Sequence, residues 1–296
     1  MNVLMSGATG LLGTVLIPEL GARGHRVTRL TRSPRSADDV SWDPETGKID
    51  GALTGTEAVI HLAGESIAEG RWTPEKKRRI IESRRKGTRL LAESIAALPA
   101  PPSVMVSTSA DGYYGDRGNE LLTEESGPGS GFLAEVCREW EAAADPAREA
   151  GIRVVHPRTG IVLTPKGGAL GRTLFIFKLG AGGKVGSGRQ YWSWVALDDV
   201  VGSFVYALEN KAVSGPANVC SPNPVTNAEY TRVLGRVLNR PTVFPVPATA
   251  ARVALGGVAD ELLLASKRMV PTRLEDAGYE FRYPHLEGAL RHLLGR

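Results

Sequence analysis

A glycine-rich turn near the start of the chain constrains the fold more than any other feature. Gly7, Gly10 and Gly13 form the pattern G-x-x-G-x-x-G. The turn follows an apolar run at 3–5, which predicts a buried strand, and precedes apolar residues at helical spacing over 12–20. This order is typical of a dinucleotide site, in which the glycines allow a tight turn, close approach of a pyrophosphate and close helix packing. A strand-to-helix connection without a ligand is the alternative.

Strands and helices alternate through the first half of the chain. The expected elements are strands at 26–30, 58–62, 104–107 and 153–156, and helices over 74–98 and 132–150. Crossovers of this length favour parallel strands with helices on both faces. The sequence therefore predicts an α/β fold, a Rossmann-like doubly wound parallel sheet.

The end of the second expected strand bears on the choice of cofactor. An NAD site usually places a carboxylate there, on the ribose 2′-hydroxyl. This chain has Thr31, Arg32 and Ser33 instead. Because the Arg32 guanidinium can bind a 2′-phosphate through two hydrogen bonds, the sequence predicts NADP(H) rather than NAD. A solvated loop arginine is the alternative.

The regular alternation stops after Pro157, and residues 164–190 are rich in glycine and lysine. Helices are expected at 198–209, 227–239, 248–255 and 284–294. We expect residues 1–160 to form an NADP-binding Rossmann domain. Residues 161–296 are expected to form mainly a smaller, irregular C-terminal substrate lobe, with segments near 190–220 returning to the sheet.

Composition excludes several other classes of protein. The 296 residues include two cysteines in dissimilar contexts and no histidines at metal-ligand spacing, so we expect neither a disulfide framework nor a metal site. The N-terminus lacks a basic signal-peptide region, and no apolar run reaches the roughly 18–20 residues of a membrane span. We therefore expect a cytoplasmic protein without membrane contact. The basic run at 76–86 contains no interleaved aromatic residues, which argues against nucleic-acid binding.

Three further stretches carry a resemblance to a known family. They are His61-Leu62-Ala63-Gly64-Glu65, the motifs at 186–190 and 192–194, and the tail at 270–286. With them the whole chain resembles the atypical epimerase-family branch of the extended short-chain dehydrogenase/reductase superfamily. The resemblance implies an NADP(H)-binding oxidoreductase or epimerase-like protein, whose substrate is a small carbonyl, hydroxyl or nucleotide-sugar-type compound.

The glycine turn and the resemblance together imply a set of binding residues. The expected cofactor residues are Gly7, Thr9, Gly10, Leu11, Leu12, Gly13, Thr31, Arg32, Leu62, Ala63, Gly64, Glu65, Arg84, Ser107, Thr108, Pro157 and Arg158. For Arg84 the alternative is a solvated basic helix face. The expected substrate residues are Arg189, Gln190, Trp192 and Trp194, since aromatic walls with few polar groups suit a small organic ligand. Alternatively, the tryptophans close the second lobe.

The Tyr-x-x-x-Lys pair that the superfamily uses for catalysis is missing. In such a pair the lysine lies one helical turn from the tyrosine and lowers its pKa, so the phenol can act as acid or base. Here Leu133 stands at the tyrosine position and Cys137 at the lysine position. We expect Tyr113 or Tyr114 to supply the proton and Ser109 or Thr108 to polarise a carbonyl, with lid packing as the alternative for the tyrosines.

The missing pair also keeps a second function open. A catalytically weak regulator that binds NADP(H) and senses its redox state would need neither residue. The aromatic second lobe favours the enzyme, and the absent tyrosine and lysine favour the regulator.

Overall fold

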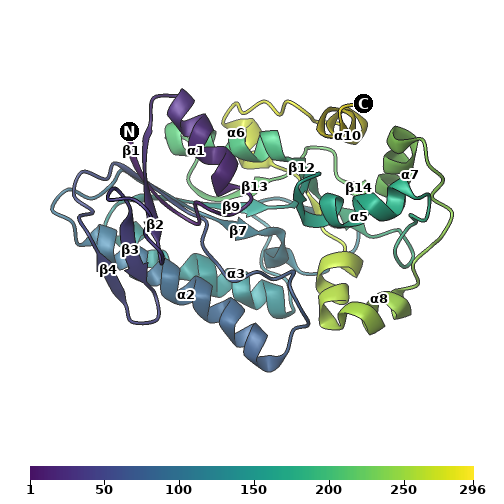
Figure 1. The fold of residues 1–296 in the computed structure, drawn as a ribbon, viewed down its shortest axis with the longest axis horizontal. Helices are drawn as coiled ribbons and strands as arrows, with labels where there is room; N and C mark the ends of the chain where they lie inside the picture. The colour runs from purple at the N-terminus through teal and green to yellow at the C-terminus, as the bar shows by residue number, and fades with distance from the viewer.

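A nine-stranded sheet forms the centre of the protein in a computed structural model that describes residues 1–296. Its order is β13-β9-β6-β5-β1-β2-β3-β4, with β7 beside β9 (Figure 1). The strands are β1 Asn2–Ser6, β2 Arg26–Thr31, β3 Val40–Asp43, β4 Lys48–Asp50, β5 Ala58–His61, β6 Val104–Ser107, β7 Ser109–Ala110, β9 Arg153–Thr159 and β13 Gly215–Val219. Every pair is parallel except the hairpin β3–β4. This arrangement confirms the predicted fold class.

Helices cover both faces of the sheet (Figure 1). They are α1 Gly13–Ala22 and α6 Leu197–Glu209 on one face, and α2 Pro74–Ala96 and α3 Phe132–Ala142 on the other, where α4 Asp145–Glu149 packs against α2. Successive side chains of a strand point to opposite faces. Accordingly, Val3 and Met5 of β1 belong to the core under α1 and α6, whereas Leu4 belongs to the core under α2.

The helix predicted over 132–150 is wrong in its length, because it is divided into α3 and α4. Pro146 lies in the first turn of α4. Proline has no backbone N–H and disfavours a helical conformation in the residue before it, so one continuous helix cannot pass through this point.

The C-terminal lobe surrounds a separate core, which includes Leu163, Trp194 and Leu234. Its helices are α5 Gly168–Lys178, α7 Asn227–Leu238, α8 Ala248–Leu255, α9 Thr272–Asp276 and α10 Leu286–Leu294. Its short strands are β8 Leu121–Leu122, β10 Ile161–Thr164, β11 Tyr191–Trp192, β12 Trp194–Ala196, β14 Val225–Thr226 and β15 Arg268–Met269. Two further turns are the 3₁₀ helix η1 Asp111–Tyr114 and the π-helix η2 Ala259–Leu264. β13 returns to the central sheet beside β9, while α5 and the hairpin β3–β4 were not among the predicted elements.

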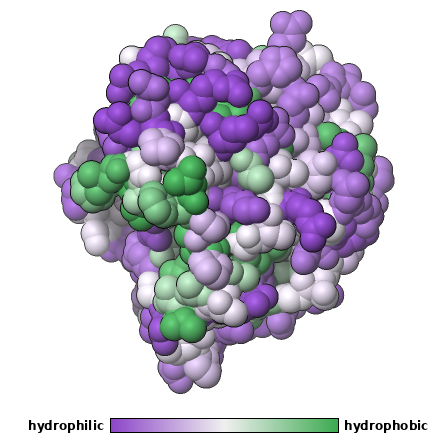
Figure 2. All heavy atoms as spheres, turned by 90° about the vertical axis from the view of Figure 1, so that its right-hand side faces the viewer, coloured by the Kyte–Doolittle hydropathy of each residue, from purple (hydrophilic) through white to green (hydrophobic).

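Exposed apolar side chains are concentrated on the C-terminal lobe. Figure 2 views the end of the molecule at which α7 and α8 lie and shows apolar groups between polar ones. The most exposed are Phe175, Leu179, Val243, Phe244 and Val253. No helix is both long enough and apolar enough to cross a membrane.

Candidate functional site

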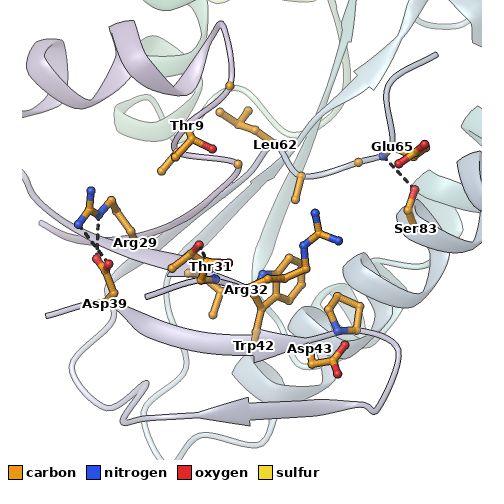
Figure 3. A pocket seen from close by; sticks show the side chains of 18 of the residues that line it. Thr9, Arg29, Thr31, Arg32, Asp39, Trp42, Asp43, Leu62, Glu65 and Ser83 are labelled. Atoms are coloured by element: carbon orange, nitrogen blue, oxygen red, sulfur yellow. Dashed lines mark hydrogen bonds and ion pairs between the residues drawn. The ribbon is translucent and has the colours of Figure 1, made fainter. Parts of the chain in front are cut away.

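A cleft of about 480 Å³ lies at the carboxyl ends of β1, β2 and β5. Ligands bind at this edge of open parallel sheets. The cleft brings together nine of the expected cofactor residues: Gly7, Thr9, Gly10, Thr31, Arg32, Leu62, Ala63, Gly64 and Glu65 (Figure 3). They come from three separate loops, so the fold assembles most of the site that the sequence indicated.

Each position of the turn requires glycine for a different steric reason. Gly7 has φ +71°, a left-handed conformation that side chains rarely adopt. A Cβ on Gly13 would lie 2.5 Å from the Gly7 carbonyl oxygen, so this glycine allows α1 to begin close to the turn. A Cβ on Gly10 would have one close neighbour, the Gly7 oxygen at 3.3 Å. Gly10 therefore keeps the backbone accessible from the cleft.

The carboxylates of the cleft are occupied by other protein groups. Asp39 accepts hydrogen bonds from the Arg29 guanidinium at 2.7 and 3.1 Å and from the N–H groups of Arg35 and Ser36. The N–H of Arg35 and the guanidinium of Arg29 hold the pKa of Asp39 below its ordinary value. Asp43 accepts from the Thr46 hydroxyl, and Glu45 from Lys86.

By contrast, the Arg32 side chain makes no hydrogen bond or ion pair with the protein. It extends across Trp42 toward the side of the cleft that carries Glu65 and Ser83 (Figure 3). Arg32 is therefore a cation free to bind an anionic group at the end of β2.

Arg84 lies under the floor of the cleft rather than in it. Its guanidinium donates to the carbonyl oxygens of Glu65 at 2.9 Å and Ile80 at 3.2 Å, and lies 4.6 Å from the Trp140 ring centroid. Burial lowers the pKa of Arg84 to about 10. The solvated alternative is wrong for this residue, because Arg84 is 9% exposed, and its visible role is to hold the segment at 62–65.

A buried polar network occupies the region beyond β6. The Glu141 carboxylate accepts from the Ser109 hydroxyl at 2.7 Å and from Arg158 through two bonds of 2.9 Å. Arg158 also donates to the Tyr114 hydroxyl, which donates to Asn218 at 2.8 Å. Burial raises the pKa of Tyr114 to about 12.

This network corrects part of the expected catalytic set. Tyr114 is fully buried with its hydroxyl engaged, so it is not available as a proton donor. Ser109 and Arg158 are equally buried and face Glu141 rather than the cleft. Tyr113 alone has an unengaged hydroxyl, and its ring lies over the Arg158 guanidinium at 3.4 Å.

Leu133 and Cys137, which stand at the positions of the missing tyrosine and lysine on α3, lie against Gly112 of η1. A Cβ on Gly112 would lie 2.9 Å from the Leu133 Cβ and 3.6 Å from the Cys137 Sγ. Burial raises the pKa of Cys137 to about 12, so the thiol does not ionise near neutral pH. Neither side chain can provide acid–base chemistry there.

The other expected cofactor residues occupy varied positions. Leu11 and Leu12 connect the glycine turn to α1, and Leu11 is exposed. Ser107 and Pro157 are buried in β6 and β9, and Thr108 is half-buried after β6. None of these five contributes to the wall of the cleft.

The aromatic wall expected for a substrate belongs instead to the second core. Trp194 is fully buried, and its N–H donates to the Asn223 carbonyl oxygen. Trp192 and Gln190 donate to the Leu263 carbonyl oxygen. The alternative that the tryptophans close the lobe is therefore the one the structure supports, and Arg189 is exposed at its surface.

Several cleft residues were not anticipated. Trp42 and Asp43 come from the hairpin β3–β4. Arg29 lies in β2, Asp39 directly precedes β3, and Ser83 comes from α2. The alternation of Val40 and Trp42 as buried residues was the available sequence signal for the extra strand.

Comparisons with known proteins agree with this architecture. Residues 3–220 match the model of the NAD dependent epimerase/dehydratase family, and residues 246–293 match a domain of unknown function, DUF1731. An epimerase family protein of Mycobacterium tuberculosis, MT2273, is 41% identical over 99% of this chain and 98% of its own. The crystal structure of the human epimerase family protein SDR39U1 with NADPH superposes with a TM-score of 0.92 at 34% identity, over 100% of this chain and 99% of that one. A nucleoside-diphosphate sugar epimerase from Corynebacterium glutamicum gives a TM-score of 0.82 at 38% identity, over 100% of this chain and 58% of that one.

Proposed function

Because this chain belongs to the NAD dependent epimerase/dehydratase family, we propose that it binds NADP(H) and acts as an oxidoreductase or epimerase-like enzyme on a small carbonyl or hydroxyl compound. One observation carries the proposal. The cleft presents an unpaired guanidinium, Arg32, at the end of β2, while the carboxylates of Asp39 and Asp43 are hydrogen-bonded within the protein.

The cleft and the turn that adjoins it fit the parts of NADP(H). The backbone N–H groups of Leu11 and Leu12 make no hydrogen bond within the protein and lie at the N-terminus of α1, where a pyrophosphate binds. Arg32 would hold the 2′-phosphate, and the segment at 62–65 would flank the adenosine and ribose. The human relative that was crystallised with NADPH supports this assignment.

Bound NADPH would supply a hydride, and the chain would supply binding, orientation and a proton. Tyr113 is the phenol with an unengaged hydroxyl near the end of β6, although no lysine lies one helical turn away. A phenol has an ordinary pKa near 10 and needs a neighbouring cation to work near neutral pH. The Arg158 guanidinium under the ring is paired with Glu141, so no free cation lies at the Tyr113 hydroxyl, and we expect slow turnover.

A second function is favoured by one specific observation. Leu133 and Cys137 leave the superfamily's acid–base positions without a titrating group. A protein that binds NADP(H) and reports its redox state would need no proton donor. This regulator is the alternative to the enzyme.

The transfer of deuterium from deuterated NADPH to a panel of carbonyl compounds distinguishes the two functions. The enzyme predicts deuterium in at least one alcohol product, detected by mass spectrometry. Tight NADPH binding with no transfer would support the regulator. Failure of NADPH to bind would contradict both.

A further inference from the structure

A second cavity, of about 280 Å³, lies beyond the cofactor cleft. It is bounded by η1, the N-terminus of α3 and the segment from η2 to β15, and Gly112, Leu133 and Lys267 line it. η1 follows β6 and β7, and β6 is the neighbour of β5, where the cofactor cleft ends. A dinucleotide held by Arg32 over β2 would therefore direct its other end toward this cavity.

Lys267 is the notable residue of the cavity. Its side chain is 6% exposed, and its Nζ lies 3.1 Å from an Asp111 carboxylate oxygen and 3.2 Å from the Glu261 carbonyl oxygen. Lysine is rarely buried so completely unless it is paired. The expected lysine position on α3, occupied by Cys137, faces the adjacent Gly112.

The backbone around Lys267 is held by Ser193, which belongs to the motif at 192–194, and by the neighbouring Tyr191. The Ser193 hydroxyl donates to the Lys267 carbonyl oxygen at 2.7 Å and accepts from the Met269 N–H at 2.8 Å. The Lys267 N–H donates to the Tyr191 carbonyl oxygen at 3.1 Å. These bonds fix the lysine at one end of the cavity, as a positioned functional group requires.

We infer that this cavity binds the substrate and that the Lys267 ammonium binds a substrate oxygen. The inference rests on the proposed function, because it places the substrate beside the cofactor. Lys267 supplies a cation from the C-terminal lobe in a cavity that α3 also lines, whereas the usual lysine position of α3 is occupied by Cys137.

The charges around the cavity indicate the class of substrate. Its lining includes three carboxylates, on Asp116, Asp260 and Glu261, and two cations, on Arg252 and Lys267. Arg252 is paired with Asp260 at 2.8 Å, and Lys267 is paired with Asp111. Because both cations are paired, the remaining carboxylates of the lining repel an anionic ligand.

The N-terminus of α3 is also closed to an anion. The Glu261 carboxylate accepts from the N–H groups of Phe132 at 2.9 Å and Leu133 at 2.6 Å. Small volume, acidic lining and occupied N–H groups together favour a small, uncharged hydroxy-carbonyl compound over a nucleotide sugar.

Binding of defined probes to the NADP⁺-loaded protein tests this inference. Glycolaldehyde, dihydroxyacetone and UDP-glucose would be titrated by ligand-observed NMR, with NADPH affinity measured separately on each variant. We expect a neutral probe to bind and Lys267→Met to weaken it roughly tenfold, as loss of a charge-assisted hydrogen bond does. NADPH affinity should stay unchanged. Lys211→Met, at an exposed lysine, is the matched control.

A double variant guards against misfolding. Lys267→Met alone leaves the half-buried Asp111 carboxylate without its partner, so Lys267→Met with Asp111→Asn removes both charges together. The double variant should bind the neutral probe roughly tenfold more weakly as well. Undiminished probe binding in both variants, or no neutral probe bound to the unmodified protein, would overturn the site. Tighter binding of UDP-glucose would overturn the substrate class, whereas failure of NADPH to bind the unmodified protein would count against the proposed function instead.

Discussion

Replacing Arg32 by alanine removes a guanidinium that makes no hydrogen bond or ion pair within the protein, and the carboxylates that feel its charge, Asp43 and Glu65, are already bound to Thr46 and Lys76. The side chain is exposed in the cofactor cleft, and the nearby carboxylate of Asp39 is already bound to Arg29. The substitution should therefore leave the fold and the ribose environment intact. Its effect should appear only with a cofactor that carries a 2′-phosphate.

The magnitude follows from the exposure of Arg32. A charge-assisted hydrogen bond contributes about 1.5–3 kcal/mol when it is well formed, and solvent screening at an exposed site reduces this to about 1–2 kcal/mol. A difference of 1.4 kcal/mol is roughly tenfold in affinity. We expect the unmodified protein to bind NADPH roughly tenfold more tightly than NADH, and Arg32→Ala to remove most of that difference.

Fluorescence titration of NADPH and NADH at two ionic strengths measures this directly. The NADPH preference should shrink at the higher ionic strength, because exposed charges are screened. Arg85→Ala, at an exposed arginine of α2 outside the cleft, is the matched control and should alter neither affinity. Equal affinities in the unmodified protein, or an equal loss for both cofactors in Arg32→Ala, would refute the assignment.

Three further predictions concern the turn, the tyrosines and a buried histidine. Gly10→Val should abolish NADPH binding in a titration, with little change in the melting temperature of the protein without cofactor. Gly13→Ala should instead lower the free energy of unfolding by about 1–3 kcal/mol, because its Cβ would lie 2.5 Å from a backbone oxygen. Tyr114→Phe should lower the free energy of unfolding, measured with denaturant, by about 1–3 kcal/mol, because it breaks a buried hydrogen-bond network. Tyr113→Phe should leave the stability unchanged and slow hydride transfer. An unchanged rate of hydride transfer in Tyr113→Phe would exclude that phenol as the proton donor. Burial lowers the pKa of His61 from 6.5 to about 4. As the pH falls, the unfolded chain is therefore protonated at His61 before the folded protein is, which favours unfolding. The free energy of unfolding should keep its full value above pH 6.5 and fall by about 3 kcal/mol as the pH is lowered to 4. His61→Asn should make unfolding measured across that range less dependent on pH, and an unaltered slope would contradict the shift.

Short-range patterns in the sequence were sufficient to predict much of the architecture and the cofactor cleft. Short apolar or alternating runs placed β1, β2, β5, β6 and β9, because a strand or helix is specified by residues that lie close together in the sequence. The glycine spacing placed the turn before α1 for the same reason. Arg32 and the missing pair at Leu133 and Cys137 could also be identified, since each depends on its position relative to a local element.

Tertiary structure decided which polar side chains are available for chemistry. The sequence does not show that Tyr114 donates to Asn218, 104 residues away, or that Arg84 turns under the segment at 62–65. Lys267 meets Asp111 across 156 residues, and no periodicity relates the two positions. Burial and pairing over such separations depend on how helices and strands pack together, and only packing determines whether a tyrosine, an arginine or a lysine faces a cavity or a buried partner.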